Sequence, residues 1–469
     1  MSLTDSLNKM ADTLTKSLVP WTVPDHTFAV EDFGAVGDGK TLNTTAIQKA
    51  IDTCSAQGGG VVLLSKGEYV TGTIELKSGV MLEVARDAKL LGSLNLADYP
   101  EKIPARLTIM DTYMKLRLSL IYAENCERIG IRGAGTIDGR GQSENFPGKT
   151  TQGPVPGRPF LIRIIDCRSV VVTGIHLQNA ASWLENYLNC DDLILDGIEV
   201  KNQTNGNNDG FDIDGCHNVI VRNCIINAED DAMCFKGAGL RTMENVLVEN
   251  CKAYSTCNAL KFGTDSQGSF RNVLVRNVEL GGYPPHGPKG AHGNANSGIS
   301  WEVVDGGTVE NILVTNAHIV RTGSPIFLRL GNRGRVMPGV PKPPPGKLAH
   351  LILDQITGED NGKRGSIIAG MPGARIQDVA IQNVTLSMAG GVQKPLDKPV
   401  PEKTSGYPDA GNFGPVVPAY GFWIRHAEDI RFDHVKVTPL QPDIRPEYVA
   451  GEDTSGIEID GKALENPTK

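Results

Sequence analysis

The stretch Ser169-Val170-Val171-Val172-Thr173-Gly174-Ile175 and the later stretch Asn218-Val219-Ile220-Val221-Arg222-Asn223-Cys224-Ile225 follow one pattern: alternating apolar residues, a turn residue and a further apolar residue. From Val170 to Val273 the copies of this pattern lie 23 to 27 residues apart, and beyond Val273 the spacing widens to between 28 and 51 residues. The copies begin at Ile129, Val170, Leu193, Val219, Val246, Val273, Ile312, Leu351, Val379 and Ile430. The chain is therefore built from one repeated unit.

A period of about 25 residues that holds short alternating strands, with no helical pattern between them, argues against a protein of alternating strands and helices. It favours a parallel β-helix, in which each coil lays its strands on the previous coil and cannot bury its inner face alone. Leucine-rich repeats fit less well, because their periodic leucines and single strand per repeat are absent. We therefore predict an all-β protein made of a single parallel β-helix.

Residues 27–80 have a different character from the repeats. Glycine-rich turns flank the stretch 43–51, where a threonine precedes apolar residues at helical spacing. Repeat proteins need an element that covers the open end of the core, so we predict an N-terminal capping helix here. We expect residues 1–26 to form an N-terminal extension, residues 27–440 the parallel β-helix catalytic domain, and residues 441–469 a C-terminal tail.

The composition of the 469-residue chain excludes two classes of partner. With a net charge of −8 it has no basic excess for phosphate backbones, so we expect no nucleic acid to bind. No run approaches the roughly 18 apolar residues of a membrane span, so we expect no membrane partner. Residues 1–21 have no apolar signal core, and we expect them to form an N-terminal helix. The compartment is unknown from the sequence: secreted or periplasmic if a leader has been removed, otherwise cytoplasmic.

The nine cysteines form no CxxC pair and are interpreted as small buried hydrophobes.

Carboxylates gather in two successive repeats, in Asn207-Asn208-Asp209 and in Glu229-Asp230-Asp231. Asp209 precedes Asp230 and Asp231 by 21 and 22 residues, which is close to one coil. Positions one coil apart stack at roughly 4.8 Å, so these acids should converge on one outer patch. Such like charges raise at least one pKa, as a general acid beside a general base requires. The alternative is that these residues mark turns or bind calcium.

These residues resemble the motifs of the polygalacturonase-like glycoside hydrolases, a family of pectin-degrading enzymes. Asn207-Asn208-Asp209 and Glu229-Asp230-Asp231 match that family's Asn-Thr-Asp and Gly-Asp-Asp, and the resemblance runs from about Phe33 to Thr438. It includes Gly135-Thr136-Ile137-Asp138-Gly139-Arg140-Gly141, a stretch shared with other β-helix proteins. The resemblance implies a right-handed parallel β-helix of the pectin-lyase-like kind.

Carried over residue by residue, the resemblance implies that Asp230 protonates the glycosidic oxygen while Asp209 and Asp231 hold and deprotonate the attacking water. This inverting mechanism needs carboxyl groups roughly 6.5–9.5 Å apart, so that a water molecule fits between them. It needs no metal ion and no organic cofactor. The expected partner is an acidic polysaccharide or oligosaccharide, that is, a pectin fragment.

The chain departs from the family's pattern in two places. The family's Gly-His-Gly is replaced by Cys257-Asn258-Ala259; Asn258 can hydrogen-bond a sugar or orient a carboxylate, but it cannot change charge near neutral pH. His292 could reach in from a loop, although an ordinary loop histidine fits the pattern as well. The Arg-Ile-Lys motif that grips the galacturonate carboxylate is replaced by Ile299-Ser300-Trp301-Glu302. A neutral sugar such as rhamnose on one side of the bond is compatible with that change.

Cationic and aromatic side chains remain as candidates for substrate binding. Lys236 and Lys261 are 25 residues apart and should stack beside the acids. Arg329 and Arg333 lie further along the chain, and an arginine binds a uronate carboxylate through two hydrogen bonds. Trp301 could stack on a sugar ring. For each of these residues a solvated surface charge or plain packing is the alternative.

We therefore predict hydrolysis of an α-linked galacturonate polymer, either an oligogalacturonide or the rhamnogalacturonan backbone. The long loops at 281–297 and 336–347 favour exo action on chain ends, because loops on a rigid scaffold can close one end of its binding face. One alternative is a β-helix polysaccharide lyase, which would use calcium and a basic residue. The other is a carbohydrate-binding solenoid without catalysis.

Overall fold

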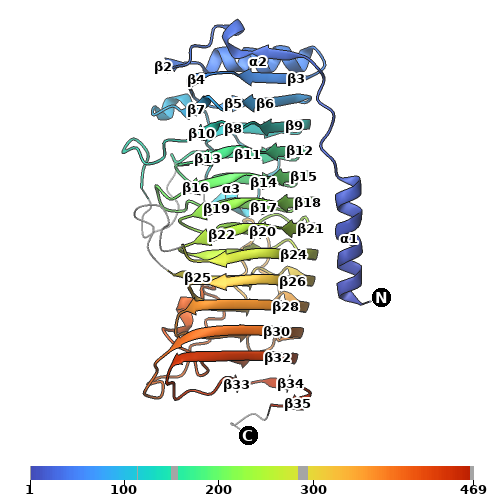
Figure 1. Cartoon of the computed structure of the whole chain (residues 1–469), viewed down its shortest axis with the longest axis vertical. Helices are drawn as coiled ribbons and strands as arrows, with labels where there is room; N and C mark the ends of the chain where they lie inside the picture. Colours follow the sequence, from blue (N-terminus) through green and yellow to red (C-terminus); the bar gives the residue numbers. More distant parts are fainter. Residues whose placement is uncertain (1, 114, 149–156, 284–293, 465–469) are drawn as a thin grey trace. The chain divides into compact units, whose positions relative to one another are not determined.

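A computed structural model of the chain describes residues 2–113, 115–148, 157–283 and 294–464. His292 lies outside these described residues. The chain divides into two compact units, which we call the N-terminal unit (residues 12–230) and the C-terminal unit (residues 1–11 and 231–469). Helices and strands carry the labels of Figure 1.

The N-terminal unit is built from three runs of parallel strands, each strand paired with its counterpart in the next coil. The first run is β1 (Thr27–Ala29), β3 (Gly60–Leu64), β6 (Val80–Val84), β9 (Glu127–Arg132), β12 (Arg168–Thr173), β15 (Asp191–Asp196) and β18 (His217–Arg222). The second is β2 (Asp38–Leu42), β4 (Gly67–Thr71), β7 (Ala88–Gly92), β10 (Thr136–Asp138), β13 (His176–Gln178), β16 (Glu199–Asn202) and β19 (Ile225–Ala228). The third is β5 (Ile74–Glu75), β8 (Ser119–Glu124), β11 (Phe160–Ile165), β14 (Glu185–Leu188) and β17 (Phe211–Asp214).

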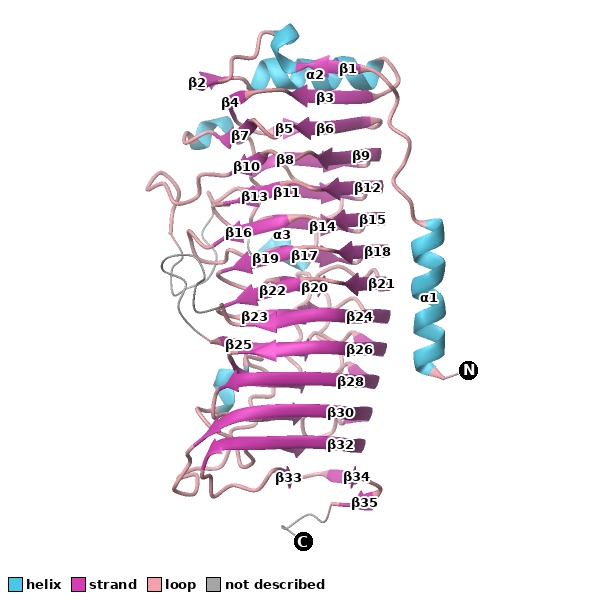
Figure 2. Ribbon diagram, viewed as in Figure 1, coloured by secondary structure: helices cyan, strands magenta, loops and turns pink. Residues whose placement is uncertain are grey.

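The C-terminal unit has the same parallel pairing but longer strands, several of 12 to 15 residues (Figure 2). One run is β21 (Met243–Glu249), β22 (Lys252–Ser255), β24 (Phe270–Gly281), β26 (Thr308–Val320), β28 (Lys347–Asn361), β30 (Ile376–Gly390), β32 (Ala427–Gln441) and β34 (Thr454–Ile459), closed by the antiparallel β35 (Lys462–Ala463). The other is β20 (Met233–Gly237), β23 (Asn258–Ser266), β25 (Ala295–Val303), β27 (Thr322–Leu330), β29 (Ser366–Ala369), β31 (Phe422–Arg425) and β33 (Tyr448–Ala450). Coil-on-coil parallel pairing in each unit confirms the predicted parallel β-helix fold class. The boundaries predicted at residues 26 and 440 stay predictions.

The strands form because apolar side chains of one parity repeat from coil to coil. In the N-terminal unit Val170 pairs with Leu193, which pairs with Val219, and all three are fully buried. Burying such a side chain contributes about 1.5–3 kcal/mol. Asn and Asp residues with positive φ turn the chain between strands, as Asn223 does between β18 and β19 at φ 56°. The apolar alternation and the turn residues in the sequence therefore correspond to the inner faces and corners of the coils.

The helices are few. The predicted capping helix is present as α2 (Thr44–Ala56), which buries Ile47, Ala50, Ile51 and Cys54 against β1, β3 and the short helix η1. The predicted N-terminal helix is α1 (Leu3–Ser17). The remaining helical turns are η1 (Val30–Phe33), η2 (Leu96–Asp98), α3 (Ile109–Tyr113) and η3 (Ala410–Phe413). Within the described part of the chain, none of the helices has the length and apolar character needed to cross a membrane.

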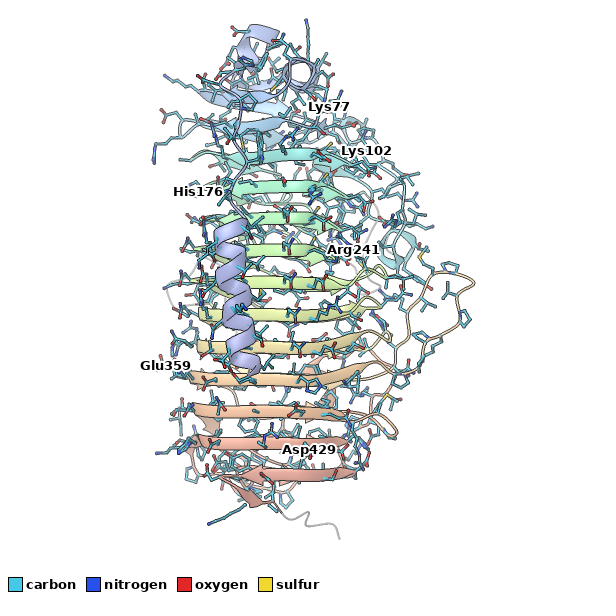
Figure 3. The ribbon with its side chains drawn as sticks, turned by 90° about the vertical axis from the view of Figure 1, so that its right-hand side faces the viewer. Lys77, Lys102, His176, Arg241, Glu359 and Asp429 are labelled. Atoms are coloured by element: carbon cyan, nitrogen blue, oxygen red, sulfur yellow. The ribbon has the colours of Figure 1, made fainter. Side chains whose placement is uncertain are left out.

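Ion pairs lie on the outer surface of the N-terminal unit, and Figure 3 labels Lys77, Lys102 and His176 among the residues that form them. Lys77 lies 2.7 Å from Asp52, and His176 lies 3.1 Å from Glu199. These side chains are about half exposed, so each pair contributes little to stability. The charged side chains near the predicted catalytic acids are, by contrast, buried.

Candidate active site

Asp209 lies on a loop of the N-terminal unit that a buried asparagine holds in shape. The side-chain amide of Asn208 donates to the carbonyl oxygens of Ala180 (2.9 Å) and Ser182 (2.8 Å), while its oxygen accepts two backbone N–H groups of its own loop. Asn202 donates to the carbonyl oxygen of Asp209 at 2.8 Å. Asp209 precedes β17 by two residues and is 3% exposed, so these bonds fix the backbone that carries its side chain.

A fully buried arginine that the sequence analysis did not single out lies beside this loop. Arg158 donates to the carbonyl oxygen of Gly206 and to the side-chain oxygen of Asn207 (2.9 Å), and the amide of Asn207 donates in turn to Asp230 (3.2 Å). Burial lowers the pKa of Arg158, although nearby carboxylates oppose that shift. Those carboxylates are Asp209, Glu229 and Asp230. Arg158 thus connects the two predicted catalytic acids of the N-terminal unit.

Asp231, the first residue of the long C-terminal segment, is held at both carboxylate oxygens. Asn258 donates to one oxygen at 2.7 Å, and the ammonium group of Lys261 lies 2.8 Å from the other. Burial alone would raise the pKa of Asp231, but the ammonium groups of Lys261 and Lys236 lower it below its ordinary value. Asp231 is therefore a buried carboxylate that stays ionised.

Lys261 also contacts two groups that come from later parts of the chain. Its ammonium lies 3.4 Å from Glu302 and donates to the hydroxyl of Tyr407 at 3.0 Å. Ser300 and Thr264 donate to the two oxygens of Glu302, at 2.8 and 2.9 Å. Burial raises the pKa of Glu302. Burial alone would lower the pKa of Lys261, but the carboxylates of Asp231 and Glu302 raise that pKa well above its ordinary value. Glu302, which lies in the stretch that replaces the family's Arg-Ile-Lys motif, is thus part of a buried ion cluster.

Tyr407 belongs to the segment 391–421, which packs against residues of β27, β29 and β31. Arg329 is fully buried and donates to four backbone carbonyl oxygens, two of which, on Glu402 and Lys403, belong to this segment. Phe413 packs against Phe327 in the same cluster. Burial lowers the pKa of Arg329 to about 10. These bonds favour a structural role for Arg329, and its predicted contact with substrate stays a prediction.

Arg333 is likewise committed to protein partners. It lies 2.9 Å from Asp265 and also pairs with Asp305, which is fully buried. Arg335 lies 3.4 Å from Asp265. Burial would raise the pKa of Asp265, but Arg333, Lys236 and Arg335 lower it. Lys236, 5% exposed, therefore acts on both Asp265 and Asp231.

Trp301 lies inside the coil. Its ring is fully buried and stacks on Phe262 at a centroid distance of 5.3 Å and an interplanar angle of 7°. It pairs in register with Phe262 and Leu328, which are also fully buried. The ring therefore has no face open to a sugar in this arrangement.

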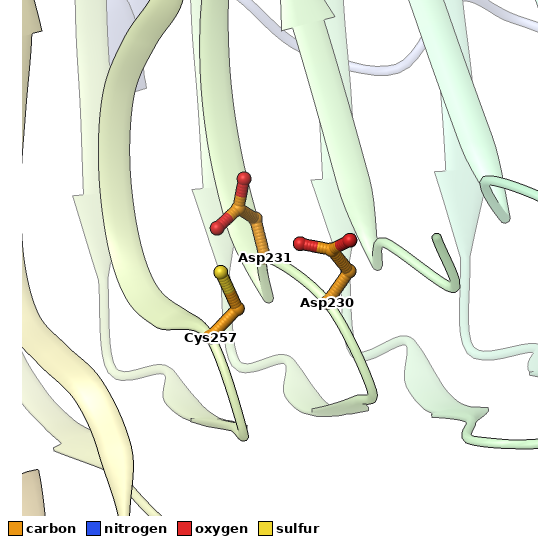
Figure 4. A group of neighbouring side chains, drawn as sticks. All are labelled: Asp230, Asp231 and Cys257. Carbon is orange, nitrogen blue, oxygen red and sulfur yellow. The ribbon is translucent and has the colours of Figure 1, made fainter. Parts of the chain in front are cut away.

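The acids around Asp231 also offer oxygen and sulfur atoms of the kind that bind metals. Figure 4 draws Asp230, Asp231 and Cys257, each of which offers one ligand atom, and these three atoms lie within 4.8 Å of one another. Both oxygens of Asp231 already accept hydrogen bonds, one of them from an ammonium group. A second cation beside a buried ammonium would be repelled. The chemistry of this cluster thus suits proton transfer better than metal binding.

Parts of this chain are similar to known glycosyl hydrolases and polygalacturonases. Residues 79–281 match "Glycosyl hydrolases family 28", and residues 27–83 match "Rhamnogalacturonase A/epimerase, pectate lyase-like". A "Probable polygalacturonase" of Vitis vinifera is 31% identical over 220 residues, which cover 45% of this chain and 44% of that protein. The match thus spans less than half of that relative.

Two solved structures share the fold. The Family 28 exopolygalacturonase of Yersinia enterocolitica has a TM-score of 0.71 at 22% identity and covers 94% of this chain and 79% of its own. The exopolygalacturonase of Thermotoga maritima has a TM-score of 0.68 at 21% identity and covers 81% and 91%. At such identities the likeness concerns the fold, and it agrees with the parallel β-helix of this chain. The resemblance expected from the Asp motifs is confirmed.

Proposed function

With residues 79–281 carrying the sequence pattern of the glycosyl hydrolases of family 28, we propose that this chain is an inverting glycoside hydrolase that cleaves α-linked, galacturonate-containing pectin. The observation that carries the proposal is the contrast between two consecutive acids. Asp230 accepts a hydrogen bond from the neutral amide of Asn207, whereas Asp231 is paired with the ammonium group of Lys261. Neighbouring carboxyl groups in unlike surroundings can take the acid and the base role in one reaction.

In the proposed reaction Asp230 donates a proton to the glycosidic oxygen as the bond to the anomeric carbon breaks. Asp209 and Asp231, the latter kept ionised by Lys261, hold and deprotonate the water that attacks that carbon from the opposite face. Asn258 fixes the orientation of Asp231 through its 2.7 Å hydrogen bond. The products are a free reducing end with inverted configuration and a new non-reducing end.

The proposed substrate is an acidic polysaccharide or oligosaccharide of the pectin type. The names of several relatives support it, among them the "Exo-poly-alpha-D-galacturonosidase" of Dickeya chrysanthemi and the "Exopolygalacturonase X-1" of Emericella nidulans. The net charge of −8 means that binding of an acidic chain depends on local cations. These relatives are hydrolases by name and give no support to the lyase alternative.

The experiment compares hydrolysis with elimination. The protein is incubated with polygalacturonate and with rhamnogalacturonan in the presence of EDTA, and reducing ends and ultraviolet absorbance are followed together. We expect new reducing ends without an unsaturated product, and an anomeric configuration opposite to that of the substrate in NMR spectra. An unsaturated product that the chelator abolishes would contradict the proposal. Binding of pectin fragments without turnover would instead support the carbohydrate-binding solenoid.

A further inference from the structure

Four cysteines of the N-terminal unit stand in one column, one in each of four successive coils. Each of them immediately precedes a strand of the first run, namely β9, β12, β15 or β18, which follow one another in Figure 1. The register of these strands places each cysteine beside its counterpart in the next coil. All four carry reduced thiols. We call this column, which consists of Cys126, Cys167, Cys190 and Cys216, the cysteine ladder.

Hydrogen bonds between successive coils fix the sulfur atoms of the cysteine ladder. The backbone N–H of Cys126 donates to the sulfur of Cys167 at 3.3 Å. The backbone N–H of Cys190 donates to the sulfur of Cys216 at the same distance of 3.3 Å. Parallel strands stack at roughly 4.8 Å, which falls within the range of about 4.4–6.8 Å between the Cα atoms that a disulfide joins. Neighbouring thiols of the ladder are therefore close enough to be bridged.

The two ends of the cysteine ladder differ in their access to solvent. Cys190 and Cys216 are fully buried, which agrees with the interpretation of the cysteines as small buried hydrophobes. Cys167 is 1% exposed, whereas Cys126, in the first coil of the ladder, is only partly buried. A reagent that arrives from solvent therefore meets Cys126 before the other thiols of the ladder.

The surroundings of Cys126 also favour its thiolate form. A hydrogen bond with the side chain of Cys167 lowers the pKa of Cys126 to about 7, against the effect of burial and with help from Ser78. The same hydrogen bond and burial raise the pKa of Cys167. Burial raises the pKa of Cys54, a cysteine of α2 outside the ladder, to about 11. Because the thiolate is the nucleophile in thiol chemistry, Cys126 should react before Cys167 and Cys54 do.

We propose that Cys126 and Cys167 form a redox-active dithiol, in which Cys126 reacts with low-molecular-weight disulfides and Cys167 then closes a disulfide between two coils. In the first step the thiolate of Cys126 attacks one sulfur of the small disulfide, which gives a mixed disulfide on Cys126 and releases one small thiolate. In the second step Cys167 loses its proton and attacks the sulfur of Cys126, and the second small thiolate leaves. The protein dithiol is oxidised by two electrons, and the small disulfide is reduced to two thiols. This chemistry does not depend on the proposed hydrolysis.

The first experiment identifies the products of oxidation. The reduced whole chain is incubated with oxidised glutathione at neutral pH, the remaining thiols are blocked with N-ethylmaleimide, and the peptides are identified by mass spectrometry. We expect a disulfide between Cys126 and Cys167 in the wild type. Cys167→Ser should instead accumulate glutathione on Cys126, because the second thiol is missing. A wild type that keeps both thiols reduced, or that keeps glutathione on Cys126 without closing the bond, overturns the proposal.

A matched variant and a rate measurement control this experiment. Cys54→Ser removes a fully buried cysteine of the same unit and should leave the yield of the Cys126–Cys167 disulfide at its wild-type value. At neutral pH, iodoacetamide should alkylate Cys126 of the wild type at least ~10-fold faster than Cys54. Equal or slower alkylation of Cys126 overturns its role as the nucleophile. Both measurements on the wild type decide the proposal even if a variant fails to fold.

The second experiment measures what the disulfide does to stability. Cys126 and Cys167 are 41 residues apart in the chain, so a bond between them restricts the unfolded chain more than the folded one. We expect oxidation to raise the midpoint of thermal unfolding by at least ~2 °C, and dithiothreitol to reverse this shift. Cys126→Ser, treated in the same way, should show no shift. An oxidised wild type that unfolds at the midpoint of the reduced protein would show that the bond does not stabilise the coils, and would overturn that role.

Discussion

The ammonium nitrogen of Lys261 lies 2.8 Å from a carboxylate oxygen of Asp231, and the two side chains are 1% and 4% exposed. Removing both charges from water is costly, and their attraction offsets that cost only while both partners are present. The pair therefore keeps Asp231 ionised in surroundings that would otherwise favour its neutral form. Lys261 thereby controls the charge that a general base needs, although the histidine of the family pattern is absent.

Replacing Lys261 with Met should shift the acidic limb of the pH profile of kcat/KM. Without the ammonium, burial dominates and the pKa of Asp231 rises, so the ionised form persists only at higher pH. We expect the acidic limb of the kcat/KM profile to move to higher pH, and Lys261→Arg to restore part of the wild-type profile. Lys252→Met, which removes a cation half exposed beside Glu279, is the control. A profile with an unmoved acidic limb would show that Lys261 does not govern Asp231.

Replacing Arg158 with Met should lower kcat more than it changes KM. Arg158 holds Asn207, and Asn207 donates to Asp230, so its loss leaves the proposed acid free to move. A displacement of about 1 Å at a reacting group can cost on the order of 100-fold in rate. Steady-state kinetics of Arg158→Met and Asn207→Ala measure the effect, and both variants should have a lower kcat than the wild type. Normal kcat in a folded Asn207→Ala protein would contradict this role.

The sequence predicted the coils and the acids because both obey the period. Asp209 and Asp230 come 21 residues apart and precede β17 and β20, so spacing alone predicted that they lie close together. The alternation of side chains along a strand gives further information. Ile299 and Val303 lie two residues before and after Trp301, so all three side chains face the same side of β25 and point into the core, which accounts for the buried ring of Trp301. A tryptophan between two apolar positions of one parity is thus predicted to be inside.

The groups that the sequence did not predict come from outside the repeat. Tyr407 belongs to the segment inserted where the spacing between Val379 and Ile430 widens to 51 residues, and no periodicity relates it to Lys261. Arg158 precedes its strand and contacts a loop 49 residues later. Widened spacing identifies such insertions, but which residue of an insertion reaches the site depends on tertiary packing. Arg329 was predicted to bind substrate because its own strand does not reveal the segment that covers it.

The segment 391–421 should restrict the enzyme to chain ends. It is held on the sheet by Arg329 and by the contact of Phe413 with Phe327. We expect the wild type to release short products with little fall in substrate viscosity. Arg329→Met loosens the segment and should increase the viscosity loss per bond cleaved. Arg431→Met, an exposed partner of Asp378, should behave as the wild type does. Early release of long oligosaccharides by the wild type would exclude exo action.

Glu185 should make the N-terminal unit less stable as the pH rises. It lies in register between Ile162 and Phe211, fully buried within the coil, and burial raises its pKa to about 8 from an ordinary 4.5 even though Tyr187 donates to it. Because the folded-state pKa is the higher one, stability is fully present below about pH 4.5 and is lost as the pH rises through about 8. The loss between pH 5 and pH 8 is roughly 3 kcal/mol. Glu185→Gln should flatten this dependence.

Thermal unfolding of the wild type and of Glu185→Gln at pH 5, 6.5 and 8 measures this effect. The two proteins should differ least at pH 5, with the variant more stable at pH 8. Glu83→Gln, on the half-exposed partner of Arg132, controls for the general loss of a carboxylate. Parallel stability curves for the wild type and Glu185→Gln would show that Glu185 does not remain neutral in the folded state.

The roles proposed for the three aspartates differ in how they depend on the leaving group. If Asp230 is the acid, its loss should harm substrates with poor leaving groups most, because a good leaving group departs with little help from a proton. Asp230→Asn should therefore keep partial activity on an activated aryl glycoside that the enzyme accepts. Asp209→Asn and Asp231→Asn remove assistance to the attacking water, which every substrate needs, so they should lose roughly 10²–10⁴-fold on activated and natural substrates alike. Near-normal turnover by all three folded variants would place the active site elsewhere, and equal losses on both kinds of substrate for Asp230→Asn would remove it from the acid role.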